Sequence, residues 1–286
     1  MRQKLLLVLP FLLLIGCGST DDNTTETQNV DTYSNTLALP PEYNVTWYKP
    51  TTDTSWQWQL TGTINSSYNV DVYDIDLFET SKETIEALQS DGKKVICYFS
   101  AGSFEDWRED KDEFPIEALG NDLDDWDGEK WLDIRNLKVR KIMENRLDLA
   151  KSKGCDGVEL DNIDGYDNSS GFDLTFNNQL DYNTFLSNEA HKRGLSIGLK
   201  NDFEQARLLE PYFDFSVSEE CFINNECTLL VPFIEANKPV FEVEYQEQYI
   251  TNSEAREELC QESRELHFQT LVLPMELDDT FRYSCQ

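Results

Sequence analysis

The residues best suited to chemistry stand in the segment Gly154–Tyr166, which reads GCDGVELDNIDGY. Its apolar residues Val158 and Leu160 alternate with acidic ones, as in a β-strand, where side chains point to opposite faces with a period of two. The carboxylates of Glu159 and Asp161 therefore share the other face, and Asp, Asn and Gly residues typical of a loop follow. Either this face is solvated, or its carboxylates point into an active site at the end of the strand.

Other catalytic motifs are missing from the sequence. The two histidines, His191 and His267, lie in helical patterns, and no His pair or Cys-x-x-Cys spacing indicates a zinc or iron site. No dinucleotide-binding GxGxxG, phosphate-binding P-loop or serine nucleophile elbow occurs. The chemistry on offer is therefore that of carboxylates.

The elements that must position these carboxylates alternate between strands and helices from Trp56 onward. About 240 residues suffice for one domain with a sizeable core, and the alternation predicts a (β/α)8 TIM-type barrel, with a doubly wound open sheet as the rival. A Thr251-x-x-Glu254 capping box marks the start of the last helix. The predicted strands are 56–62, 69–78, 94–103, 157–163, 195–202, 213–219, 238–245 and 270–278, and the predicted helices are 80–90, 139–152, 178–193 and 251–268.

The active site of such a barrel lies at the carboxyl ends of its strands. Like charges repel in a concave mouth, so a cluster of carboxylates there requires a cationic ligand, a metal, internal cations or raised pKa values. Paired carboxylates at one mouth are what glycoside hydrolysis needs, one as acid and one as nucleophile or base. The side chains assigned to the inward phase at this end are Asp74, Asp76, Tyr98, Ser100, Asp161, Lys200, Asp202, Glu219 or Glu220, Glu242, Glu244, Glu276 and Asp278.

Three tryptophans occupy the long segment between the third and fourth strands, residues 104–136. They are Trp107, Trp126 and Trp131. Aromatic rings there either stack on the faces of a sugar or pin the long segment to the barrel. The sequence does not separate these two interpretations.

Five segments stand in one collinear order between about Trp56 and Cys285: Cys97–Ser103, Trp131–Arg135, Gly154–Asn162, Gly198–Asp202, and Glu219–Phe222 with Glu226 and Cys227. Together they resemble endo-α-1,4-polygalactosaminidases, glycoside hydrolase family 114. The resemblance implies a barrel fold and an endo-acting hydrolase of α-1,4-linked galactosamine, a cationic polysaccharide of fungal and bacterial biofilms. It implies no metal and no organic cofactor.

The same resemblance implies that Asp161 and Glu219 are the catalytic carboxylates. The chain departs from the family pattern at Leu160, where the family has Pro, and at Glu220, where it has Gln. Strict alternation from the preceding strand residues sends Glu220 inward, so the choice of Glu219 requires a bulge at the strand end. We expect Asp161 to act as nucleophile or base, and Glu219 as general acid.

The remaining polar residues at the mouth are expected to bind substrate, because acidic side chains attract the ammonium groups of deacetylated galactosamine. Two alternatives stay open: a glycosidase for another α-linked sugar, and a non-catalytic, lipid-anchored polysaccharide-binding protein on the same barrel. The expected substrate-binding residues are Asp74, Asp76, Tyr98, Asn162, Asp164, Lys200, Asp202, Glu220, Glu244 and Asp278.

The net charge of −31 argues against nucleic acid and anionic membrane surfaces as partners. Seven cysteines are present, and six remain for disulfides if Cys17 is lipidated. Their spacing predicts one disulfide between Cys221 and Cys227 and another between Cys260 and Cys285. The state of the remaining pair, Cys97 and Cys155, is left open.

The chain begins with a short basic start and an apolar run, 1–16, too short to span a bilayer and typical of a signal peptide. Leu14-Ile15-Gly16-Cys17 resembles a bacterial lipobox, which makes Cys17 the lipidation site; a plain signal peptide is the alternative. Residues 17–52 are predicted to form a low-complexity tether and 53–286 the hydrolase domain. We expect an exported lipoprotein at the outer membrane or cell surface, monomeric and bound to the membrane only through its anchor.

Overall fold

A curled, mostly parallel sheet organises residues 37–286, which are the residues that the computed structural model describes. The parallel strands follow one another in chain order, and a short final strand pairs antiparallel with the last of them. This uninterrupted order differs from a doubly wound sheet, in which the strand order reverses at a switch point. The strands are β1 (Trp56–Gln59), β2 (Val72–Asp76), β3 (Lys94–Ser100), β7 (Gly157–Asp161), β8 (Ser196–Lys200), β9 (Phe215–Glu219), β10 (Val240–Glu244), β11 (Gln269–Val272) and β12 (Tyr283–Ser284).

The two faces of the sheet carry two separate apolar clusters. The inner cluster contains Trp56 and Trp58 of β1 together with Phe241 and Val243 of β10. Although β1 and β10 are far apart in the strand order, the rings of Trp56 and Phe241 stack with centroids 4.8 Å apart. The sheet is therefore curled, so that its first and late strands meet across its concave side.

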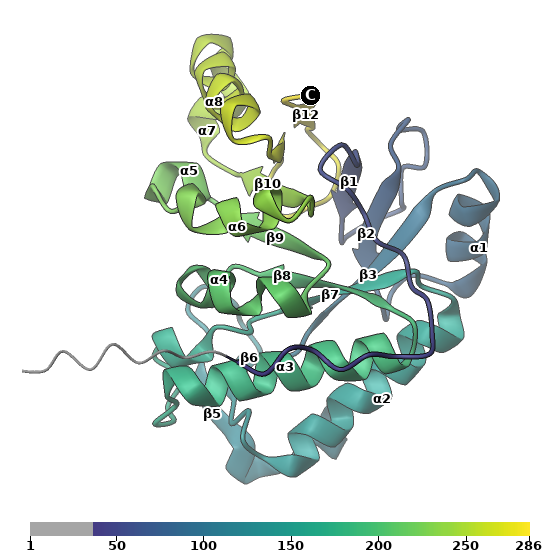
Figure 1. Cartoon of the computed structure of the whole chain (residues 1–286), viewed down its shortest axis with the longest axis vertical. Helices are drawn as coiled ribbons and strands as arrows, with labels where there is room; N and C mark the ends of the chain where they lie inside the picture. The colour runs from purple at the N-terminus through teal and green to yellow at the C-terminus, as the bar shows by residue number, and fades with distance from the viewer. Residues whose placement is uncertain (1–36) are drawn as a thin grey trace, which may run out of the picture. The chain divides into compact units, whose positions relative to one another are not determined.

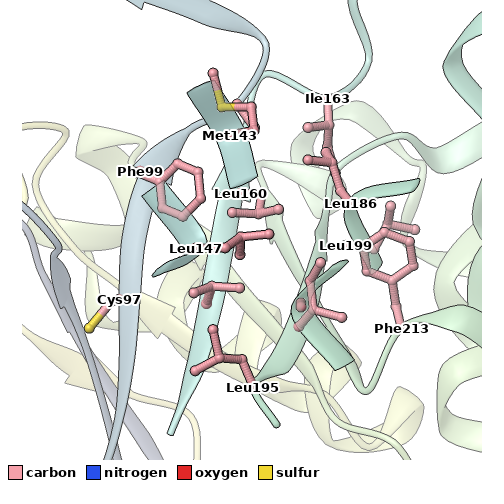
Figure 2. Packing of buried hydrophobic residues seen from close by; sticks show 14 of the residues in the cluster. Cys97, Phe99, Met143, Leu147, Leu160, Ile163, Leu186, Leu195, Leu199 and Phe213 are labelled. Carbon is pink, nitrogen blue, oxygen red and sulfur yellow. The ribbon is translucent and has the colours of Figure 1, made fainter. Parts of the chain in front are cut away.

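The outer cluster lies between the sheet and the helices, which Figure 1 shows around the outside of the strands. Figure 2 shows Leu160 and Leu199 of the neighbouring strands β7 and β8 beside Leu147 and Leu186 of the covering helices. None of the described helices has the length and apolar character needed to cross a membrane. The helices are α1 (Lys82–Ser90), α2 (Leu137–Lys153), α3 (Phe176–Lys192), α4 (Ala206–Leu209), α5 (Cys221–Asn224), α6 (Val231–Glu235), α7 (Glu247–Thr251) and α8 (Ser253–Leu266).

Local sequence sets the ends of the long helices. Asn136 caps α2 by accepting a hydrogen bond from the backbone N–H of Lys138, and Gly154 ends the helix with a left-handed φ of 94°. The cap predicted at Thr251 is wrong. Asn252 caps α8 instead, accepting from the N–H groups two and three residues on, because Thr251 is the last residue of the preceding short helix α7.

The long segment between β3 and β7 forms a small antiparallel sheet of β4 (Ser103–Glu105), β6 (Glu129–Leu132) and β5 (Leu119–Asp122). Two buried arginines tie this segment to the main sheet. Arg108 Nη2 lies 2.7 Å from both Asp76 of β2 and Glu105 of β4, and Arg146 of α2 pairs with Glu105 at 3.4 Å and Asp110 at 2.8 Å. The insertion is therefore a fixed wall of the domain.

The prediction that Glu242 and Glu244 of β10 point into the barrel is wrong. Phe241, Val243 and Tyr245 belong to the inner cluster, so Glu242 and Glu244 face outward toward α5. There the carboxylate of Glu244 accepts the backbone N–H groups of Phe222 and Ile223, at 2.8 and 3.2 Å, and Glu242 accepts that of Cys221 at 3.3 Å. The prediction assumed that the apolar phase always packs under the helices, whereas on this side of the sheet apolar side chains fill the concave interior.

The predicted boundary between tether and domain, at 52/53, is corrected by contacts of the preceding residues. The ring of Trp47 stacks on His191 of α3 at 4.2 Å, and its Nε1 donates to Asp214 at 2.9 Å. Tyr43 donates to Asn188 of α3 at 3.0 Å. Residues from Tyr43 onward therefore belong to the folded body, while the predicted signal peptide, Cys17 and the tether as far as 36 lie outside the described residues.

Three disulfides join pairs of cysteines within the described residues. The predicted pairs Cys221–Cys227 and Cys260–Cys285 are confirmed. The pair left open also forms a disulfide, which joins Cys97 of β3 to Cys155 just before β7.

Removing the Cys97–Cys155 disulfide is expected to lower the stability of the fold more than removing Cys221–Cys227. The bonded residues are 58 apart in the first pair and 6 in the second. Loop entropy alone gives about 4 kcal/mol and about 2 kcal/mol, respectively. Urea unfolding of the two double Cys→Ala variants measures this order; an equal or reversed loss would contradict it.

Candidate active site

A cavity of about 670 Å³ opens at the carboxyl ends of the strands. Its floor comes from the main sheet, one wall from the β5–β6 insertion, and another from the segment after β11. Cavities at this end of parallel strands are the usual place for catalysis. The predicted site residues that line it are Tyr98, Asp161, Asn162, Asp164, Lys200, Glu219 and Glu220.

Asp161, the last residue of β7, is held by three donors. Its Oδ2 accepts from the hydroxyl of Tyr98 at 2.8 Å, and its Oδ1 accepts from Lys200 Nζ at 3.0 Å and from the N–H of Asn162 at 2.8 Å. Burial opposes ionisation, but the Lys200 charge and these hydrogen bonds hold the pKa of Asp161 below its usual value. Asp161 is therefore an ionised carboxylate that faces the cavity.

Glu219, the last residue of β9, reaches the same cavity from the second strand beyond β7 in the sheet. Its Oε1 accepts from the hydroxyl of Tyr245 at 2.5 Å, and Asn201 Oδ1 accepts its backbone N–H at 3.0 Å. No bulge is needed to turn it inward. Phe215 and Val217 belong to the inner cluster, and the pairing of β9 with β10 runs without a register shift, so simple alternation delivers Glu219 to the interior.

Lys200 joins the two carboxylates. Its Nζ lies 3.0 Å from Asp161 Oδ1, 3.2 Å from Glu219 Oε2 and 3.1 Å from Glu159 Oε1, and only 2% of its side chain is exposed. Burial disfavours the ammonium form, yet the three carboxylates raise the pKa of Lys200 well above its usual value. A permanent cation therefore sits between the two predicted catalytic groups.

The chain turns sharply where each strand delivers its polar residues. Asn162, Asn201 and Glu220, which directly follow β7, β8 and β9, have left-handed φ values of 59°, 47° and 56°. Asn adopts this region more readily than most residues. At Gly102 a Cβ atom would lie 1.6 Å from the Asn162 carbonyl oxygen, so this close approach of two strand ends requires glycine.

Two further carboxyl groups on the cavity wall hold their protons to a higher pH than ordinary carboxyl groups do. Burial, followed by the charge of Asp161, raises the pKa of Asp164 to about 7. Burial also raises the pKa of Glu129 to about 7, although a hydrogen bond from Ser103 opposes this shift. Near neutral pH these two side chains therefore gain or lose protons easily as the charge inside the cavity changes.

Two of the three tryptophans of the insertion lie at the cavity, as expected for rings that contact a sugar. Trp126 and Trp131 line the cavity, and Trp126 leaves 51% of its surface exposed there. Trp107 is also exposed but does not line the cavity, and its ring lies beside Gly128. Trp126 thus offers an apolar face to a sugar, whereas Trp107 does not face the site.

Five predicted substrate-binding residues do not line the cavity. Asp76 is paired with Arg108, Asp202 is buried and accepts from Asn183, and Glu244 faces α5. Asp74 is fully buried beneath the site. Asp278 accepts from Thr280 within its own turn instead. These corrections share one cause, since acidic residues at a strand end were all assigned to the mouth, whereas some pair internally or face outward.

Sequence reasoning missed Tyr245, Asn201 and Glu129 as parts of the site. Tyr245 was detectable, because it continues the phase of Phe241 and Val243 to the strand end. Asn201 was included in the strand predicted over 195–202, where alternation with Lys200 pointed it outward, whereas β8 ends at Lys200 and Asn201 lies in the turn that follows. In residues 37–286 no group of three or more His, Cys, Asp or Glu side chains is arranged to hold a metal ion.

Comparison with known proteins agrees with this geometry. The family model described as glycoside-hydrolase family GH114 matches residues 36–286. The solved structure of Aspergillus fumigatus Ega3 in complex with galactosamine is 43% identical, with a TM-score of 0.80, and the match covers 86% of this chain and 100% of that chain. No curated protein matches the chain.

More distant structures share the fold alone. The glycoside hydrolase domain of PelA from Pseudomonas aeruginosa is 14% identical, with a TM-score of 0.62 and coverage of 81% of this chain and 98% of that one. Eubacterium rectale Amy13B is 11% identical, with a TM-score of 0.51 and coverage of 71% and 58%. The family match, the close relative and the paired carboxylates at the mouth lead to one conclusion: the chain belongs to glycoside hydrolase family 114 and is a glycoside hydrolase.

Proposed function

We propose that this protein is an endo-acting hydrolase of α-1,4-linked galactosamine polymers, with Asp161 and Glu219 as its catalytic pair. The observation that carries the proposal is their convergence on Lys200 inside one cavity, from strands β7 and β9. The 43% identity to a protein whose structure holds galactosamine supports this choice of sugar.

Asp161 is suited to the role of nucleophile because its low pKa keeps it ionised. It attacks the anomeric carbon while Glu219, as general acid, gives its proton to the departing glycosidic oxygen. The resulting glycosyl ester on Asp161 is then cleaved by a water molecule, whose proton returns to Glu219. Tyr245, which donates to Glu219 at 2.5 Å, orients this acid toward the bond.

The products are expected to retain the α configuration. Since Asp161 Oδ1 and Glu219 Oε2 both contact Lys200 Nζ, these oxygens lie at most about 6 Å apart, which is below the roughly 6.5–9.5 Å that leaves room for an inverting water. Proton NMR of the first product formed from a galactosamine oligosaccharide measures this. A β anomer as first product would contradict the prediction.

The charge of the cavity suits a cationic sugar. Asp122, Asp124, Asp167 and Glu220 line it beside the catalytic pair, and Lys200 is the one Lys or Arg among the residues that line it. An ammonium group near Asp164 also favours its ionised form, since an opposite charge lowers the pKa of a carboxyl. An uncharged N-acetyl group neither attracts the acidic lining nor lowers the pKa of Asp164.

Hydrolysis of three polymers tests the proposal: α-1,4-galactosamine, its N-acetylated form and chitosan. We expect new reducing ends from the first, with a ladder of oligosaccharides that indicates internal cleavage. Faster release from either of the other two would assign a different sugar. Binding of all three without release would identify a polysaccharide-binding protein.

We further propose that the curled sheet closes as a (β/α)8 barrel, which gives the site a single mouth. Contacts between the first strand and the end of the domain support closure. Trp56 Nε1 donates to the carbonyl of Gln269 at 2.8 Å, and the Leu60 N–H donates to the carbonyl of Leu277 at 3.1 Å.

We also propose that the protein is exported and lipid-anchored through Cys17, at the outer membrane or cell surface. The three disulfides support an oxidising compartment. Radiolabelled palmitate incorporation that is lost in Cys17→Ala tests the anchor; unchanged labelling would contradict it.

A further inference from the structure

A second pair of acidic side chains lies beneath the proposed catalytic carboxylates. Asp74 of β2 and Glu159 of β7 are both fully buried and line no part of the cavity. They cannot touch a sugar, so any effect on the reaction must pass through a neighbouring side chain. That neighbour is Lys200, whose Nζ lies 3.1 Å from Glu159 Oε1.

The two buried acids are close neighbours that influence each other's ionisation. Neither oxygen of Asp74, nor Oε2 of Glu159, has a hydrogen-bond partner in residues 37–286. A single proton held between the two carboxyl groups would satisfy both, and each carboxyl shifts the pKa of the other. Burial and the charge of Glu159 raise the pKa of Asp74 well above its usual value, so Asp74 carries the proton and donates it.

Glu159 is the member of the pair whose charge changes near neutral pH. Burial raises its pKa to about 7, against the opposing effect of the Lys200 cation. Ionisation of Glu159 therefore adds one negative charge next to Lys200. The titratable groups around Glu159 are Asp74 from β2, Tyr98 from β3, Asp161 from β7, Lys200 from β8, Glu219 from β9 and Tyr245 after β10.

We propose that Glu159, with Asp74 as its proton-bearing partner, is a positioning residue that fixes Lys200 under the catalytic pair and extends activity to higher pH. This role rests on the proposed catalytic pair. When Glu159 ionises, its negative charge next to Lys200 makes further loss of protons from the cluster around that cation less favourable. Activity therefore persists to a higher pH than it would with a neutral side chain at position 159.

The test is the pH profile of kcat/KM for galactosamine polymer in Glu159→Gln. We expect the alkaline limb to move to lower pH by about one unit, which is the order of a single close charge in a protein interior. The acid limb should not move, because Glu159 is already neutral there. A merely structural role would lower activity by the same factor at every pH, and that result, or an unmoved alkaline limb, would overturn the proposal.

Two further variants sharpen this experiment. Asp74→Asn keeps a neutral donor to Glu159 and should retain the wild-type profile, so a shifted alkaline limb in this variant would count against Asp74 as the donor. Glu86→Gln, an exposed substitution of the same kind on α1, should also leave the profile in place.

Carbon-13 NMR titration of the carboxyl groups gives a readout that does not depend on the substrate. In the wild type, the resonance assigned by its loss in Glu159→Gln should titrate near pH 7. A midpoint near the ordinary value for a glutamate would overturn the role of Glu159, whether or not the polymer is hydrolysed. Failure of the polymer assay alongside a midpoint near 7 would instead refute the proposed function alone.

Discussion

Asp161→Asn is expected to abolish hydrolysis, with a loss in kcat of at least about a thousandfold. The amide occupies the same volume but is a poor nucleophile, and it cannot carry the negative charge that Lys200 and the Tyr98 hydroxyl now stabilise. Initial rates of reducing-end release from galactosamine polymer measure the loss.

The fold should survive this substitution. Asp161 is a strand-end residue whose neighbours can still hydrogen-bond an amide oxygen, so circular dichroism and the thermal midpoint should change little. Asp91→Asn, at the exposed end of α1, is the matched control and should keep full activity. Turnover of Asp161→Asn within tenfold of wild type would remove Asp161 from the proposed mechanism.

Lys200→Met is expected to damage both stability and activity. It leaves Glu159, Asp161 and Glu219 without the cation that lies within 3.2 Å of each of them. Removing one partner from a buried ion pair costs about 3–5 kcal/mol. Activity should also fall, because Asp161 loses the main interaction that keeps it ionised.

The pH dependence of this damage identifies its cause. Without Lys200, burial raises the pKa of the remaining carboxyls in the folded state, so the folded state binds more protons than the unfolded state and stability decreases as pH rises. The loss in free energy of unfolding relative to wild type should therefore be largest near pH 8 and shrink toward pH 5. Urea unfolding at several pH values measures it, with the exposed Lys141→Met as control; a deficit independent of pH would contradict the electrostatic explanation.

Much of the fold followed from alternation in the sequence. On β2, β3, β7 and β8 the apolar phase packs against helices and the polar phase faces the concave side, so Asp161, Tyr98 and Lys200 were placed in the correct cavity. The same rule failed on β9 and β10. There Phe215, Val217, Phe241 and Val243 fill the interior instead.

The inward direction of these apolar side chains could not be recognised from one strand alone. The apolar side chains of a strand can pack either against the helices outside or against the opposite strands inside. Only the curl of the sheet, which brings Trp56 against Phe241, decides between them. Glu219 therefore faces inward by regular alternation and not through the expected bulge, and Glu244 was placed on the wrong face.

Long-range pairing limited the remaining predictions. Asp76 was assigned to the substrate site from its phase at a strand end, and its pairing with Arg108 was not foreseen because Arg108 lies 32 residues away, in a segment with no clear pattern. Cys97 and Cys155 are similarly distant, and only the neighbouring positions of β3 and β7 in the sheet bring them together.

The most direct test of the central claim compares hydrolysis rates of Asp161→Asn, Glu219→Gln and the double variant on galactosamine polymer. If the two carboxylates serve one bond-breaking event, removing the second costs little once the first is gone, because residues that act as a unit are strongly non-additive. We predict a double-variant rate close to that of the slower single variant. Losses that multiply, or substantial activity in either single variant, would show that the two groups do not work on one glycosidic bond.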